Sequence, residues 1–107
     1  MWLGRRALLL SCTSPEMVPF WNQMAQEGWV DRVPDGVIPG EGDAARRVEL
    51  RADVDAYVAR HVYKLTRDEL KLIIDTFTQL AGIEEKRDGE FRTKRLVLGA
   101  HDRLTAP

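Results

Sequence analysis

The chain has 107 residues, of which 44% are hydrophobic and 31% are charged, and its formal net charge is −1. This length allows one domain with a modest core, and the composition excludes an intrinsically disordered chain. A net charge near zero neither favours nor excludes a nucleic-acid partner, so the distribution of charge carries that question. The single cysteine, Cys12, excludes an internal disulfide framework and is typical of a reducing cytoplasm.

The chain starts with a basic and then apolar segment, residues 1–12. The apolar run after Arg6 is shorter than the roughly 7–15 residues of a signal-sequence core. No run approaches the about 18 apolar residues of a membrane span. We therefore expect a cytoplasmic chain without a membrane partner. Residues 7–11 are expected to form either a short buried strand or an irregular start, because periodicity does not separate the two.

A short helix and a loop are predicted next. Ser14 can cap a helix, Pro15 suits its first position, and Glu16 favours the positive end of the helix dipole. Apolar residues then recur at helical spacing as far as Met24. Prolines and glycines are frequent in residues 29–42, which we interpret as a loop.

Three longer helices are predicted over residues 43–63, 66–78 and 90–104. The first carries an apolar stripe along one face. The second opens with a capping box, in which the hydroxyl of Thr66 and the carboxylate of Glu69 satisfy backbone donors.

The stretch between the last two helices contains Gly82 and a charged run over residues 84–89. We interpret it as a break followed by a solvated connector. Together the elements predict a mainly α fold, a small helical domain of three to four helices with a short N-terminal strand as an alternative start. Within this single domain, residues 1–42 form an N-terminal segment packed across a three-helix region, residues 43–104.

No catalytic, cofactor-binding or metal site is evident in the sequence. It contains no Gly-rich phosphate loop and no G-x-S-x-G elbow. Asp75 followed by Glu84 and Lys86 superficially matches a D…E-x-K nuclease pattern, whose residues normally lie on adjoining strands. His61 and His101 have no further ligands at metal spacing. We therefore expect no enzymatic activity from this chain alone.

The densest positive patch surrounds the start of the last helix. Its members are Arg92, Lys94 and Arg95, with Lys86 and Arg87 just upstream. Guanidinium groups bind phosphate bidentately, and the interleaved Phe91 can pack against a sugar or base, so the patch is a candidate for DNA-backbone contact. The alternative is a solvated helix face whose charge is balanced by neighbouring carboxylates: Glu84, Glu85, Asp88 and Glu90.

An ordered series of short segments resembles one known group of enzymes. The segments are Thr66–Leu70, Asp75–Phe77, Gly89–Leu98 and Asp102–Leu104, preceded by Thr13–Phe20, Arg46–Arg47 and Leu50–Tyr57. They resemble the C-terminal end of large DNA adenine methyltransferases, namely type IIG restriction–modification enzymes and BREX phage-defence methyltransferases. The resemblance covers roughly residues 8–104.

The chain departs from that family at four positions. It has Lys64 where a glycine commonly follows tyrosine, and Thr78 where a proline usually follows the T-F pair. It has His101 where tyrosine is common, and Gly42 where a tryptophan often precedes the long helix. It also lacks the F-x-G-x-G loop for S-adenosylmethionine and the N-P-P-Y motif for a flipped adenine. No catalytic residue is carried over, and S-adenosylmethionine belongs to the resembled enzymes only.

The resemblance implies a C-terminal fragment of a DNA methyltransferase or restriction enzyme that supports target recognition within a larger assembly. The five basic residues would then contact the DNA backbone, which supplies affinity and register rather than sequence choice. The alternative is a protein–protein docking module. Its apolar helix faces would complete a split methyltransferase without touching DNA, and its basic residues would pair with nearby carboxylates.

Overall fold

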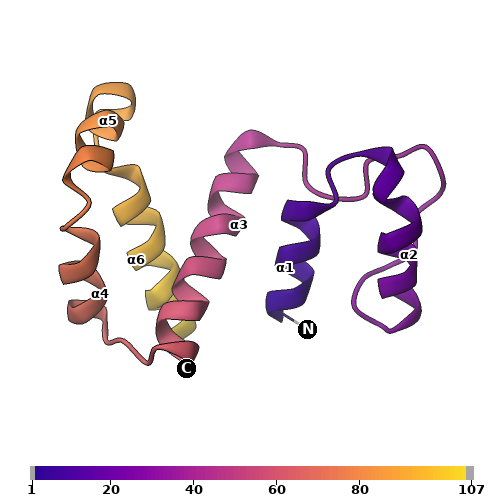
Figure 1. Cartoon of the computed structure of the whole chain (residues 1–107). Helices are drawn as coiled ribbons and strands as arrows, with labels where there is room; N and C mark the ends of the chain where they lie inside the picture. The colour runs from indigo at the N-terminus through magenta and orange to yellow at the C-terminus, as the bar shows by residue number, and fades with distance from the viewer. Residues whose placement is uncertain (1, 106–107) are drawn as a thin grey trace. The chain divides into compact units, whose positions relative to one another are not determined.

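The computed structural model describes residues 2–105, and helices make up its regular structure (Figure 1). In chain order these are α1 (Trp2–Ser11), a 3₁₀ turn η1 (Pro15–Met17), α2 (Val18–Gln26), α3 (Ala44–Tyr57), the π-helical η2 (Val58–Val62), α4 (Arg67–Ile74), α5 (Thr78–Asp88) and α6 (Arg92–Thr105). The predicted mainly α fold is confirmed.

The start of the chain is helical, so the expected strand or irregular start over residues 7–11 is wrong. Leucine and alanine favour a helix over a strand, and they make up most of this stretch. Leu8 is buried and Cys12, which follows α1, is fully buried, and this spacing of four residues places both on one face. The sequence did not show which residues share this buried face, because the residues next to Leu8 in the chain are apolar as well.

The break at residues 81–82 and the connector over residues 84–89 are also wrong as predicted. Helix α5 runs through Gly82 to Asp88 and ends at Gly89, whose φ of 77° is left-handed. One glycine costs a helix only about 1 kcal/mol, which the helix-favouring residues around it offset. The helical structure is interrupted earlier, between α4 and α5. There the N–H of Thr76 donates to the carbonyl of Ile73, and the N–H of Phe77 donates to that of Ile74.

The described helices belong to two compact units, Met1–Val54 and Asp55–Pro107. Helix α3 begins in the first unit and ends in the second. This boundary lies inside α3. The sequence analysis had instead divided the chain into an N-terminal segment, residues 1–42, and a three-helix region, residues 43–104. An unbroken helix gives no compositional signal of such a boundary.

The first unit closes its core with the long loop that follows α2. Leu8, Cys12 and Trp21 form the buried centre, and Trp29, Val30 and Val33 from the loop pack against it. The indole N–H of Trp21 donates to the carbonyl of Asp31 at 2.7 Å. The amide side chain of Asn22 exchanges two hydrogen bonds with the backbone of Val33, at 2.9 and 3.0 Å.

The end of this loop is fixed against the end of α1. The N–H of Gly40 donates to the carbonyl of Cys12 at 2.8 Å, and the N–H of Glu41 donates to that of Leu9 at 2.9 Å. A Cβ atom at Gly40 would lie 2.5 Å from the Cys12 oxygen and 2.6 Å from the Leu9 oxygen. Only glycine therefore allows this approach.

In the second unit, α4 and α6 contact each other and run in opposite directions (Figure 1). The two ends show the orientation, because Arg67 at the start of α4 pairs with Asp102 near the end of α6 at 2.9 Å. Asp75 at the end of α4 pairs with Lys94 near the start of α6. The predicted capping box of Thr66 and Glu69 is confirmed, with both reciprocal hydrogen bonds formed.

The link between η2 and α4 contains an unusual backbone conformation. Lys64 has a φ of 56°, and it is the one non-glycine residue with a positive φ among residues 2–105. A side chain with a Cβ atom pays roughly 1 kcal/mol to adopt this left-handed conformation, which glycine adopts freely. The chain thus places a lysine where its own backbone favours glycine.

Candidate functional site

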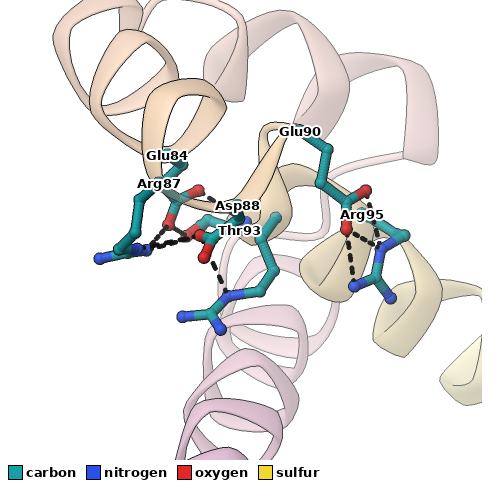
Figure 2. A network of polar contacts seen from close by, with 7 residues as sticks. Glu84, Arg87, Asp88, Glu90, Thr93 and Arg95 are labelled. Carbon is teal, nitrogen blue, oxygen red and sulfur yellow. Dashed lines mark hydrogen bonds and ion pairs between the residues drawn. The ribbon is translucent and has the colours of Figure 1, made fainter.

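The predicted basic residues gather at the corner between α5 and α6. Lys86 and Arg87 lie in the last turn of α5, and Arg92, Lys94 and Arg95 lie in the first turn of α6. The structure therefore brings the predicted patch together in space, and Figure 2 shows carboxylates beside two of its members, Arg87 and Arg95.

Glu84 lies at the centre of this corner. Its residue is only 4% exposed, although it is an acidic residue on a short surface helix. One carboxylate oxygen accepts the backbone N–H of Thr93 at 2.8 Å, and the other accepts the hydroxyl of Thr93 at 2.7 Å (Figure 2). Thr93 is in the first turn of α6, whose N–H groups lack intrahelical partners and carry partial positive charge. Glu84 is thus an N-terminal cap for α6 supplied by α5.

Two of the predicted arginines share a carboxylate beside that cap. The guanidinium of Arg87 donates to Asp88 at 2.8 Å and lies 3.5 Å from Glu84. Arg92 approaches the same Asp88 oxygen at 3.7 Å. The hydrogen bond raises the pKa of Arg87 and lowers the pKa of Asp88, as a mutual charge pair requires.

The other two cations on α6 are paired as well. Arg95 donates to both carboxylate oxygens of Glu90, at 2.9 and 3.0 Å (Figure 2), and this raises the pKa of Arg95. Lys94 pairs with Asp75, the residue that follows α4, a contact between residues 19 apart that no local pattern predicted. Lys86 differs, because it is exposed and has no ion pair with the described residues. Four of the five candidates for DNA contact therefore already have carboxylate partners.

The docking alternative predicted exposed apolar helix faces without naming their residues, and the same unit has such a surface. We call it the docking face and define it by Phe77, Leu80 and Ile83, which are 50%, 39% and 60% exposed. A shallow hollow of about 500 Å³ is lined by residues 76–80 at its start. Leu72 and Ile73 on α4 are exposed too. Among the neighbouring apolar residues, Leu70 and Ile74 are buried, whereas Ile73 and Phe77 are not.

The residues of the superficial nuclease pattern have other roles. Asp75 pairs with Lys94, and Glu84 caps α6 through Thr93. His61 packs on the ring of Tyr57 with centroids 4.5 Å apart, and the Nε2 atom of the buried His101 lies 3.1 Å from the carbonyl of Leu65. Within residues 2–105, no three metal-ligating side chains form a group that could hold a metal ion.

A second hollow, of about 550 Å³, lies in the first unit between α1, α2 and the loop. Its two clearest polar groups already hold the loop in place. The indole N–H of Trp21 donates to Asp31, and the Nε atom of Arg5 donates to the carbonyl of Trp29 at 2.8 Å. Burial raises the pKa of the nearby core thiol, Cys12, which disfavours its reactive thiolate form.

The helices described here include none with the length and apolar character needed to cross a membrane. Comparison with known proteins finds no family model, no curated protein and no solved structure that matches the chain.

Proposed function

We propose that this chain is a docking module, the C-terminal piece of a methyltransferase-like assembly, which binds the remainder of that assembly through the docking face. The observation that carries this proposal is the exposed apolar row Phe77, Leu80 and Ile83 beside a hollow. Contiguous exposed apolar side chains mark interaction surfaces in soluble proteins. Covering them would remove from water surface worth roughly 25 cal/mol per Å².

The backbone at two positions where the chain departs from the resembled family supports a methyltransferase-like partner. The family commonly has glycine where Lys64 stands, and Lys64 has the left-handed backbone that glycine favours. The family usually has proline where Thr78 stands, and Thr78 is the first residue of α5, where proline is most readily accepted. In both places the family's residue suits the backbone better than the residue present.

The ion pairs favour docking over DNA contact. A phosphate that binds Arg87, Arg92, Lys94 or Arg95 has to compete with a carboxylate already at 2.5–3.7 Å. It also approaches a corner that holds Glu84, Asp88 and Glu90. The predicted DNA role consequently depends on rearranged pairs, whereas the docking face is uncovered as it stands.

Co-purification tests the docking function directly. A neighbouring reading frame that encodes an N-P-P-Y-bearing protein would supply the partner. We expect this chain to bind that product, and Ile83→Glu to weaken binding at least about tenfold, because a carboxylate would be buried against apolar surface. Ile38→Glu is the matched control, since Ile38 of the first unit is 53% exposed against 60% for Ile83. Equal binding by the Ile83 variant would refute the docking face.

A salt titration tests the rival DNA role in the same assembly. Under that role, replacing Arg92, Lys94 and Arg95 with glutamine weakens DNA binding and lowers the salt slope by about one unit per lost phosphate contact. Under the docking function, the slope of the assembly stays unchanged. A lower slope together with intact co-purification would restore the DNA role for these three residues.

A further inference from the structure

A positively charged side chain, Lys86, lies at one end of the docking face, and its charge indicates the chemistry of the partner. We infer that the partner segment is an amphipathic helix whose apolar side chains cover Phe77, Leu80 and Ile83 and whose adjoining turn carries carboxylates that meet Lys86. This inference rests on the proposed docking function and adds the chemistry of the partner.

The positions on α5 place positive charge, and not negative charge, beside Ile83. Lys86 and Arg87 follow Ile83 by three and four residues, the spacing at which side chains adjoin on a helix. At about 100° per residue, Glu84, Glu85 and Asp88 are turned about 100°, 160° and 140° away from Ile83. The end of the docking face is therefore bordered by cations.

Lys86 is the cation that remains available. Arg87 donates to Asp88 at 2.8 Å and lies near Glu84, so its charge is largely balanced within the chain. Lys86 is exposed and forms no ion pair within residues 2–105. A complementary partner would bring a carboxylate to this ammonium, because matching charges at the rim of an interface favour one partner and one register.

A helix fits the docking face better than a strand does. Leu80 and Ile83 form a ridge at helical spacing, and the hollow over residues 76–80 lies at its end. Such a surface accepts a second helix by ridge-into-groove packing. A strand would need an exposed sheet edge to pair with, and the described part of the chain contains no strand.

Two synthetic helical peptides test the inference. Both carry leucines at positions i, i+3, i+4 and i+7, and the turn after them carries glutamates in one peptide and lysines in the other. Fluorescence anisotropy with the full chain is expected to show about fivefold tighter binding of the glutamate peptide at low salt. Lys86→Glu should abolish or reverse this preference. Arg51→Glu, the same charge change on α3, should leave it in place.

The outcomes separate the inference from the function on which it rests. Equal affinity for the two peptides, or binding of neither, would overturn the acidic-helix inference. If Ile83→Glu weakens both peptides equally and no charge preference exists, the docking face stands and only the partner's charge is wrong. If Ile83→Glu changes neither affinity, the docking face itself fails. A dimer in sedimentation velocity that Ile83→Glu dissociates would make a second copy the occupant and overturn the inference.

Discussion

The first unit folds a long loop over its own apolar side chains, whereas the second unit leaves several of them uncovered. Trp29, Val30 and Val33 seal the first core, and hydrogen bonds from Trp21 and Asn22 hold the loop there. The part of the second unit that the structure describes, residues 55–105, contains no such loop. Its exposed large apolar side chains are Val62, Tyr63, Leu72, Ile73, Phe77, Leu80 and Ile83, against Phe20, Val37 and Ile38 in the first.

This difference favours the proposal that the second unit, rather than the first, binds a partner through apolar side chains. A unit that satisfies its own apolar surface gains little from a partner, while one that exposes a ridge can gain from burial on binding. The second unit also buries an apolar core, which includes Leu70, Ile74, Val97 and Leu98. Polar contacts at its helix ends add to this core, namely the Glu84 cap, the capping box and the pairs that join α4 to α6. The second unit therefore combines a core of its own with apolar side chains that remain exposed.

The largest expected effect comes from removing the cap between α5 and α6. Glu84→Ala should lower the free energy of unfolding by about 2–3 kcal/mol, because two partly buried donors of Thr93 lose a charged acceptor. Urea denaturation followed by circular dichroism measures this. Glu85→Ala, at the exposed neighbour, should change stability by less than about 0.5 kcal/mol. Similar effects at both positions would show that the second unit does not depend on its cap.

The next effect concerns the loop that seals the first unit. Gly40→Ala should cost about 1–3 kcal/mol, because its Cβ atom would collide with two backbone oxygens of α1 and the following residue. Gly42→Ala is the matched control, since nothing lies within 4 Å of its added Cβ atom. Hydrogen exchange should locate the loss of protection in residues 2–54. Equal stability of the two variants would mean that the loop does not seal the core.

A smaller loss is expected at the start of α4. Thr66→Ala removes the hydroxyl that accepts the N–H of Glu69 at 3.2 Å, and such caps contribute about 1 kcal/mol. Thr66→Ser keeps the hydroxyl and should restore most of that stability. Thermal unfolding monitors both variants, and a serine variant as unstable as the alanine variant would contradict the capping role.

Two substitutions should stabilise the second unit modestly. Lys64→Gly and Thr78→Pro each suit the local backbone, and each should raise the free energy of unfolding by about 0.4–1 kcal/mol. Lys86→Gly is the control with the opposite sign, because glycine inside α5 should cost about 1 kcal/mol. A loss of stability in the Lys64 variant would show that its left-handed conformation is not strained.

The smallest effect is a dependence on pH. The backbone N–H of Thr66 lowers the pKa of Glu69, so the ionised carboxylate stabilises the folded chain above the pKa of an unfolded glutamate, about 4.3. That contribution is lost as the pH falls through the lowered pKa of the folded state. The difference in stability between the native chain and Glu69→Gln should thus narrow in acid. A constant difference from neutral pH to pH 3 would contradict this linkage.

The sequence predicted the elements that have local signals. The capping box at Thr66 and the proline-rich loop after α2 follow from residue types at fixed spacing, and both are observed. Helix α1 and the continuation of α5 through Gly82 were missed, because packing and neighbouring propensities outweighed a short apolar run and one glycine.

The site was predictable only in part. The cluster of basic residues follows from their nearness in the chain, and so do the possible partners Asp88 and Glu90. The pairing of Lys94 with Asp75 and the exposure of Phe77 both depend on how α4, α5 and α6 fold back on each other. Helical spacing names the residues that share a face, but it does not state whether another element covers that face.

Because Glu84 of α5 caps α6, the stability of α6 depends on the presence of α5. A protease that cuts in the short turn at Gly89 would leave Glu84 and Thr93 on separate fragments, held only by noncovalent contacts. The released C-terminal peptide would lose the Glu84 carboxylate that accepts the N–H and the hydroxyl of Thr93, and a helix of that length is marginal alone in water. Any division of this polypeptide that keeps α6 folded must therefore retain α5 with it.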